Sequence, residues 1–321
     1  MKKILLLTAA AVGLLLGASC QKIGQVESNG NVTFSIQTPG DAVTRAAATI
    51  GNGENVDIVH YEIYKAVSNH ANSLVGGKAL VKGHVPMSGK SATLSLNLLE
   101  DQDYVALFWA QVDGKNYYKV DDLRNVEVIY EGVMCNDEDR AAFCQKFEFN
   151  TTEKVNKPVT LLRPFAQLNL GTTKESLNIN YKIEIEQSRV KVTSPARFFN
   201  VSTLEAHTVT NNPVTFALAA DPEEDLTVND VDYKYVAMNY FLVAGKSSSV
   251  NIEFDIVTDK GTVNKEVAQV PVQKNYRTNI LGNLLTKETK IEIVVDNRFA
   301  GEWNSNEDGS YTEVTNPDFN N

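Results

Sequence analysis

The chain contains 321 residues, of which 43% are hydrophobic, 22% are charged and 8% are aromatic. This composition is typical of a folded protein of one or two domains and excludes a disordered chain. The formal net charge of -10, from 30 Lys and Arg against 40 Asp and Glu, argues against nucleic acid as a partner. Because there are 3 Cys and 4 His, a multi-ligand metal centre would need almost all of them. We therefore expect neither a metal site nor a cofactor.

The N-terminus has the pattern of a secretory signal. Lys2 and Lys3 precede an apolar run over residues 4–16, which is too short for a membrane-spanning helix. We expect residues 1–19 to be a signal peptide. Cys20 then resembles the Cys of a bacterial lipobox, although Gly17 stands where a lipobox usually has Leu. The resemblance implies that Cys20 is acylated, which would hold the protein on a membrane. Cleavage by an ordinary signal peptidase is the alternative.

Apolar and polar residues alternate along much of the remaining chain, as they do in half-buried strands. In the first such segment Val32, Phe34 and Ile36 alternate with polar residues. Alternation or runs of strand-forming residues predict strands at residues 32–36, 56–66, 92–98, 104–112, 126–130, 179–185, 214–219, 233–243, 250–256 and 290–295. Short strands separated by turns predict an all-β protein built from β-sandwiches. The polar, Pro-ended residues 154–158 predict a boundary near residue 160, with sandwiches over residues 46–160 and 161–321.

No catalytic constellation stands out in the sequence. The four His are scattered, and there is no Gly-rich phosphate loop, nucleophile elbow or marked pair of carboxylates. We expect a protein that is not an enzyme; motifs alone do not exclude a glycoside hydrolase, whose two carboxylates can lie anywhere in a chain. Cys135 and Cys144 flank an acidic segment, and in an exported protein the simplest interpretation is a disulfide that closes a small solvated loop. Two free thiols are the alternative.

Two motifs point to a known family. Residues 163–171 are Arg-Pro-Phe-Ala-Gln-Leu-Asn-Leu-Gly, and residues 275–286 are Asn-Tyr-Arg-Thr-Asn-Ile-Leu-Gly-Asn-Leu-Leu-Thr. Together with residues 56–65 and the lipobox-like start, they resemble the fimbrillin-like lipoproteins of Bacteroidales, the type V pilin superfamily. The resemblance implies two tandem transthyretin-like, Greek-key sandwiches and a lipid-anchored protein of the outer membrane and cell surface. It also implies a function in adhesion as a fimbrial subunit. We interpret the motifs themselves as packing and turn elements rather than a ligand site.

A third feature of the resemblance is the segment Thr44-Arg45-Ala46. In the pilins that this chain resembles, an Arg-specific protease cuts in this early segment and removes the first strand. A strand of a neighbouring subunit then fills the vacated groove. The resemblance therefore implies cleavage between Arg45 and Ala46, a removable segment over residues 20–45, and other fimbrial subunits as partners. Each large apolar side chain of the removed strand represents about 1.5–3 kcal/mol of burial that a replacement could recover.

The C-terminal tail departs from the pattern of a stalk subunit, which also donates a strand. Tyr311, Val314 and Phe319 do not alternate, and Pro317 would interrupt a ladder. This favours a tip or accessory position, or a surface lipoprotein that never polymerises. The alternative function is the binding of a glycan, or of a host or bacterial surface ligand, through aromatic residues such as Trp109, Tyr117, Tyr118 or Trp303.

Overall fold

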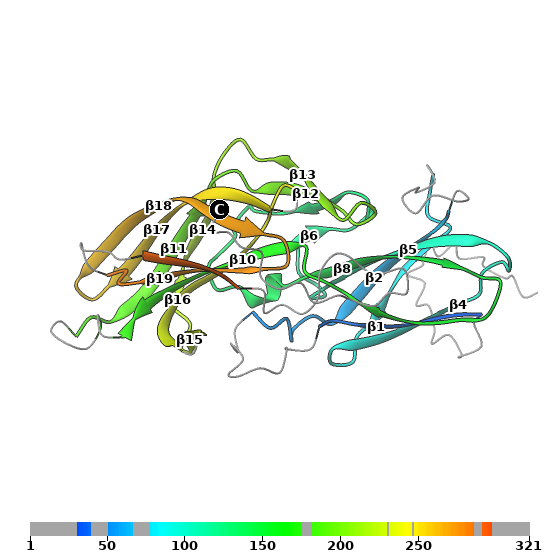
Figure 1. The fold of residues 1–321 in the computed structure, drawn as a ribbon, viewed down its shortest axis with the longest axis horizontal. Helices are drawn as coiled ribbons and strands as arrows, with labels where there is room; N and C mark the ends of the chain where they lie inside the picture. The colour runs from blue at the N-terminus through cyan, green and yellow to red at the C-terminus, as the bar shows by residue number, and fades with distance from the viewer. Residues whose placement is uncertain are drawn as a thin grey trace, which may run out of the picture.

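The computed structural model describes residues 31–39, 51–66, 77–174, 177, 182–229, 231–245, 247–285 and 291–296. Regular structure in this part of the chain is almost entirely β, which confirms the all-β prediction. A short 3-10 helix, η1 (Glu138–Arg140), interrupts the series of strands. Figure 1 shows an elongated molecule, with the earliest strands at one end and most of the later strands at the other.

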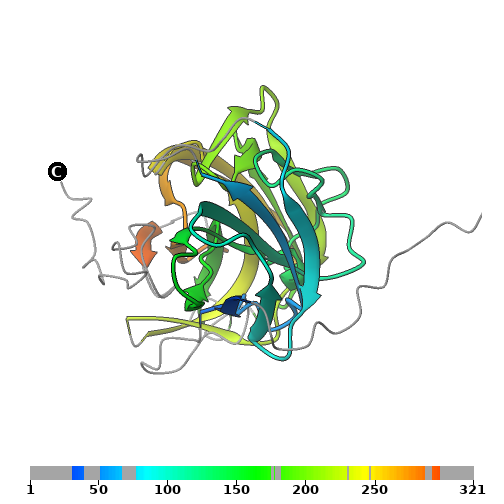
Figure 2. The same cartoon turned by 90° about the vertical axis from the view of Figure 1, so that its right-hand side faces the viewer.

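The early strands form two sheets that face each other. The smaller sheet has the order β4 (Ser91–Leu96), β1 (Val32–Gln37), β9 (Val155–Thr160). The larger has the order β3 (Val81–Pro86), β2 (Ile58–Lys65), β5 (Asp103–Gln111), β8 (Phe143–Asn150). Their inner faces contribute to one hydrophobic cluster, as expected of a sandwich. In Figure 2, seen along the long axis, the dark-blue β1 lies across from the sheet that contains β2 and β5.

The later strands form a second pair of sheets around a second hydrophobic cluster. A nine-stranded sheet has the order β20 (Ile291–Asp296), β19 (Arg277–Gly282), β10 (Phe165–Thr173), β16 (Val231–Leu242), β12 (Ala196–Asn200), β7 (Val126–Val128), β6 (Tyr118–Lys119), with β13 (Glu205–Val209) on β12 and β15 (Asp225–Val228) on β16. The facing sheet has the order β14 (Val214–Ala220), β11 (Ile185–Val192), β17 (Ser247–Thr258), β18 (Gly261–Gln273). β20 pairs with β19, so the strand predicted at residues 290–295 extends this sheet.

β5 shows how the two halves share a core. Its residues 104–110 are all at most 3% exposed, so the strand has no solvent-facing side. The Phe108 ring lies edge-on to Phe34 inside the first sandwich, at 5.4 Å between centroids. Trp109, on the opposite side of the strand, packs against Tyr118 and Phe165 at 5.3 and 6.3 Å. Because both faces are covered, the strand has a continuous apolar sequence instead of an alternating one.

Strand pairing crosses the boundary that the sequence predicts near residue 160. β6 and β7 come before that boundary, but both belong to the nine-stranded sheet. β7 pairs with β12 through Val126 and Phe199, and Phe199 is fully buried. The division at residue 160 stays a prediction, and the described contacts join the segments on its two sides.

The disulfide that we expected between Cys135 and Cys144 is not formed, because both residues are free, buried thiols. Cys144 lies on β8 within the first hydrophobic cluster, whereas Cys135 lies in the second, where its Sγ is 3.7 Å from the carbonyl oxygen of Phe216. The short segment between them carries the chain from one core to the other. Sequence proximity therefore does not bring the two sulfurs together.

Candidate functional site

The candidate site is the groove that β1 occupies. β1 is the middle strand of its sheet and pairs antiparallel with β4, from Val32 opposite Leu96 to Gln37 opposite Ser91. It pairs parallel with β9 on its other side over the same six residues. Within the described part of the chain, β1 is the only strand with which either neighbour forms a ladder. Without β1, two unpaired strand edges would face each other, and such edges bind an added strand.

The side chains of β1 alternate strictly between the core and the solvent side. Val32, Phe34 and Ile36 are 0% exposed, as their predicted place on the buried face requires. On the other side, the hydroxyl oxygens of Thr33 and Ser95 lie 3.3 Å apart across the ladder with β4. Burial of three such apolar side chains contributes on the order of 5–9 kcal/mol, at about 1.5–3 kcal/mol each.

Hydrogen bonds at both ends of β1 fix its register. At the start of the strand, the Asn31 side chain donates to the Leu98 carbonyl at 2.7 Å and accepts from the Leu98 N–H at 2.9 Å. At the end, the Gln37 side-chain amide donates to the Thr160 hydroxyl at 3.0 Å, and the Thr38 N–H donates to the Lys90 carbonyl at 3.0 Å. A one-residue slip would turn the buried row outward, so these bonds and the apolar face specify one register.

A second feature of the site is a clamp on Gly51, where the described chain resumes after β1. The Gly51 carbonyl accepts from the Arg163 guanidinium at 2.5 Å and from the Tyr240 hydroxyl at 3.0 Å, while its N–H donates to the Glu138 carboxylate at 3.0 Å. Arg163 is 2% exposed and its guanidinium lies 4.5 Å from the centre of the Phe143 ring. Burial strengthens such charge-assisted bonds. The backbone of residue 51 is thus held from both sides.

A residue other than glycine would be strained at this position of the clamp. Gly51 has φ +76°, in the left-handed region, and a Cβ would lie 2.8 Å from the Tyr240 hydroxyl and 2.9 Å from the Gln167 amide. The acidic segment that the sequence suggested as a solvated loop helps to hold the same turn. Besides the Glu138 bond, Asp139 accepts from the Asn55 side chain at 2.8 Å. Residues 51–55 are therefore fastened to the body of the protein.

The two sequence motifs lie side by side and supply part of this junction. β10 and β19 are parallel neighbours, with Gln167 opposite Arg277 and Asn169 opposite Asn279. The Asn169 side chain donates to Asn279 at 2.8 Å and accepts from the Tyr235 hydroxyl at 2.7 Å. All of these side chains are buried, and their bonds are internal to the protein. The motifs therefore form a structural polar network within the sheet, in keeping with the packing interpretation.

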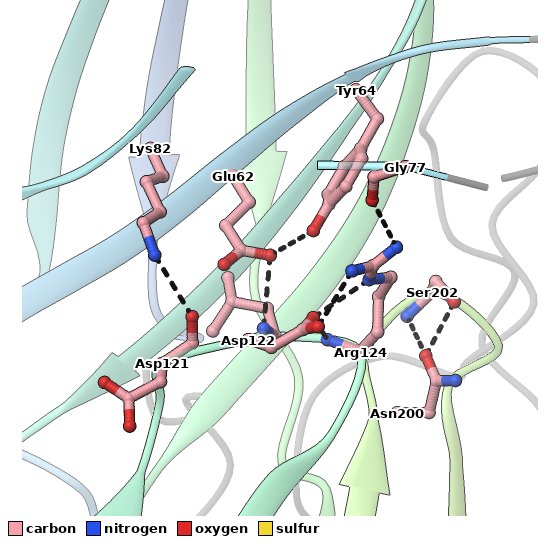
Figure 3. A network of polar contacts seen from close by, with 10 residues as sticks. Glu62, Tyr64, Gly77, Lys82, Asp121, Asp122, Arg124, Asn200 and Ser202 are labelled. Atoms are coloured by element: carbon pink, nitrogen blue, oxygen red, sulfur yellow. Dashed lines mark hydrogen bonds and ion pairs between the residues drawn. The ribbon is translucent and has the colours of Figure 1, made fainter. Parts of the chain in front are cut away.

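A second buried polar cluster surrounds the carboxylate of Glu62 on β2 (Figure 3). Glu62 is 4% exposed and accepts from the Tyr64 hydroxyl at 2.5 Å and from the Leu123 N–H at 3.1 Å. Burial raises the pKa of Glu62 above its ordinary value. Asp122 is paired with Arg124 at 2.8 and 2.9 Å, which lowers the pKa of Asp122. Both carboxylates accept hydrogen bonds from other groups of the protein. The cluster therefore joins the loop before β7 to β2.

Two of the four aromatic residues proposed for glycan binding, Trp109 and Tyr118, are buried. Trp109 is 0% exposed and its indole N–H donates to Gln111 at 3.0 Å, while Tyr118 is 6% exposed. Tyr117 is half-buried, with the Arg140 guanidinium 4.5 Å from its ring centre. Trp303 lies outside the described residues. The described residues also contain no group of three or more His, Cys, Asp or Glu suited to a metal ion.

The residues predicted for export and processing lie outside the part of the chain that the structure describes. These are the signal peptide at residues 1–19, the lipidation site Cys20 and the cleavage site Arg45 and Ala46. They stay predictions. Over the described ranges, no helix has the length and apolar character needed to cross a membrane.

The fold and the groove define an all-β protein in which a strand near the N-terminus completes a three-stranded sheet. The chain belongs to DUF6562, a family of unknown function, whose model matches residues 24–316. No curated protein matches it.

Several solved structures are similar to this chain. A candidate cell adhesion protein of Bacteroides ovatus is 11% identical, with a TM-score of 0.48 over 83% of this chain and 96% of that one. A fimbrial assembly protein of Parabacteroides distasonis is 13% identical, with a TM-score of 0.43 over 82% and 98%. The tip fimbrial protein Mfa3 of Porphyromonas gingivalis, truncated at its C-terminus, is 9% identical, with a TM-score of 0.45 over 83% and 99%.

Proposed function

We propose that this protein is a non-enzymatic fimbrial subunit of the cell surface that joins its neighbours by exchanging β1 for a strand of another subunit. Cleavage after Arg45 would release the segment that carries β1. The groove between β4 and β9 would then accept the incoming strand, with main-chain bonds providing affinity and the alternate pockets providing register.

The observation that supports this proposal is the position of β1 in the fold. The strand provides both ladders of its sheet and a fully buried row of side chains, yet it is joined to the clamped Gly51 through residues 38–50, which contain Arg45. A single cut at Arg45 would separate the strand from the body without breaking any other described element.

Limited digestion of the purified full-length protein with an Arg-specific protease tests the proposal. We expect one early cut that leaves a compact product starting at Ala46, as read by mass spectrometry. This product should assemble with other subunits in size-exclusion chromatography and electron microscopy. The matched controls are Arg45→Ala, which should block the cut and assembly, and Arg45→Lys, which should block it for an Arg-specific enzyme. A product that starts elsewhere, or a correctly cut product that does not assemble when it is mixed with the other fimbrial subunits extracted from the native cell surface, would contradict the proposed function.

We also propose that a lipid on Cys20 anchors the precursor to the outer membrane. The support is the apolar run and small residues before Cys20. Metabolic labelling with a fatty acid should mark the wild-type protein, and the Cys20→Ala variant should lose the label and leave the membrane fraction. Labelling that survives this substitution would contradict the anchor.

A further inference from the structure

The groove is lined unequally along its length, and its central pocket is aromatic. Phe34 lies edge-on to three rings of the facing sheet: Phe108 on β5 at 5.4 Å, and Phe147 and Phe149 on β8 at 5.7 and 5.2 Å between centroids. The three interplanar angles are 71°, 75° and 80°. Edge-to-face pairs of this kind contribute more than the area they bury. An aliphatic side chain at this position would lose that contribution.

The flanking pockets are aliphatic in character. On β4, Leu96 lies opposite Val32 and Ala92 lies opposite Ile36. On β9, the corresponding partners are Val155 and Val159, which are 6% and 2% exposed. The groove therefore fits a branched aliphatic residue, an aromatic residue two positions on, and a second branched aliphatic residue two positions further. This pattern reads the same in both chain directions. The aromatic pocket therefore discriminates between candidate strands in either orientation.

The C-terminal tail of this chain does not contain the pattern. Its aromatic residues after β20 are Phe299, Trp303, Tyr311 and Phe319. None of them has a Val, Ile or Leu two positions away on either side, since the neighbours at that spacing are Asn, Gly, Ser, Glu and Pro. The tail of a second copy would therefore leave the flanking pockets unfilled.

We infer that the groove selects a strand of a different subunit, one with an aromatic residue at its centre between two branched aliphatic residues, and does not take the C-terminal tail of a second copy of this chain. This inference rests on the proposed strand exchange and adds the identity of its partner. It names Phe108, Phe147 and Phe149 as the residues that determine the specificity of the groove.

The test uses the complete chain with one cut in the connection between β1 and Gly51. A variant with the recognition sequence of a highly specific protease at residues 41–46 is purified and cut, which leaves β1 bound without a covalent link. A fluorescent peptide of residues 31–38 is then added, and its uptake is followed by fluorescence anisotropy. Unlabelled competitors are the same peptide, its Phe34→Leu and Phe34→Ala variants, the outward-facing control Ser35→Ala, and a peptide of residues 297–321.

We expect the wild-type and Ser35→Ala peptides to compete equally. The Phe34→Leu peptide should bind the groove with about 10-fold lower affinity, because it lacks the energy of the aromatic pairs. The Phe34→Ala peptide should bind with at least about 30-fold lower affinity, because truncation of a hot-spot residue at an interface has an effect of this size. The tail peptide should not compete. Equal competition by the Phe34 variants, or entry of the tail peptide, would overturn the inference while leaving strand exchange intact. If no peptide enters the cut protein, strand exchange itself fails and the inference fails with it.

Discussion

Replacing Gly51 with Ala is expected to destabilise the protein by more than backbone conformation alone explains. Gly51 has φ +76°, and an L-residue in the left-handed region costs about 1–2 kcal/mol. The added Cβ would also lie 2.8 Å from the Tyr240 hydroxyl and 2.9 Å from the Gln167 amide. Overpacking of a buried site costs about 1–3 kcal/mol. The two effects together predict a loss of about 2–5 kcal/mol in the free energy of unfolding.

Gly114 provides the matched control for this substitution. It has φ +70°, but a Cβ there would meet nothing within 4 Å. Gly114→Ala should therefore lose only the backbone cost of about 1–2 kcal/mol. Urea unfolding followed by circular dichroism measures both variants, and an unchanged m-value shows that the difference lies in stability. Equal losses in the two variants would refute the view that a tight clamp surrounds residue 51.

Three further outcomes are expected. Phe34→Ala should lose about 3–5 kcal/mol of unfolding free energy in urea, whereas Ser35→Ala on the exposed side of the same strand should stay within about 0.5 kcal/mol of wild type; similar losses in both would contradict the buried row. Because burial raises the pKa of Glu62, its folded state binds a proton more tightly than the unfolded state. The contribution of Glu62 to the free energy of unfolding is therefore fully present below its unfolded pKa and is lost as pH rises through its folded pKa. Glu62→Gln should remove this loss of stability with rising pH. Parallel profiles of unfolding free energy against pH in variant and wild type would show that Glu62 does not cause the loss. Burial raises the pKa of Cys135 to about 12 and that of Cys144 well above its ordinary value, so neither thiol should react with a thiol reagent until the protein is unfolded, and rapid labelling of the native protein would contradict their burial.

Alternation predicts several strands of this fold correctly, where one face of the strand is buried and the other is exposed. It fails at residues 179–185, because residues 182–184 are not in a strand and β11 begins at Ile185. The alternation at residues 32–36 and 250–256 corresponds to β1 and β17, whose burial patterns alternate in the same way. The strand predicted at residues 126–130 contains β7, but β6 has only two residues and was not predicted. The place of β7 in the later sheet depends on its pairing with β12. Pairing of such short strands is decided by tertiary contacts rather than by local pattern.

The site was predictable in part for the same reason. The buried row of β1 follows from alternation, but nothing local in the sequence shows that Phe34 meets three rings from β5 and β8. The partners of Gly51, which are Glu138, Arg163 and Tyr240, come from segments distant in the sequence. The expected disulfide was wrong because spacing along the chain carries no information about which of two cores receives each Cys.

The groove and the clamp together explain how a single cut could control the timing of strand exchange on the proposed route. While the chain is intact, β1 is tethered to Gly51, and a short tether holds a segment near its site at an effective concentration of the order of millimolar. A competing strand of equal intrinsic affinity at micromolar concentration then occupies the groove about 10³-fold less often than β1, which corresponds to about 4 kcal/mol. Cleavage removes this advantage for β1, while the bonds to Gly51 keep the new N-terminal segment attached to the body. The uncut protein should therefore take up the labelled peptide of residues 31–38 far more slowly than the cut protein. Equal uptake before and after the cut would show that the tether does not control exchange.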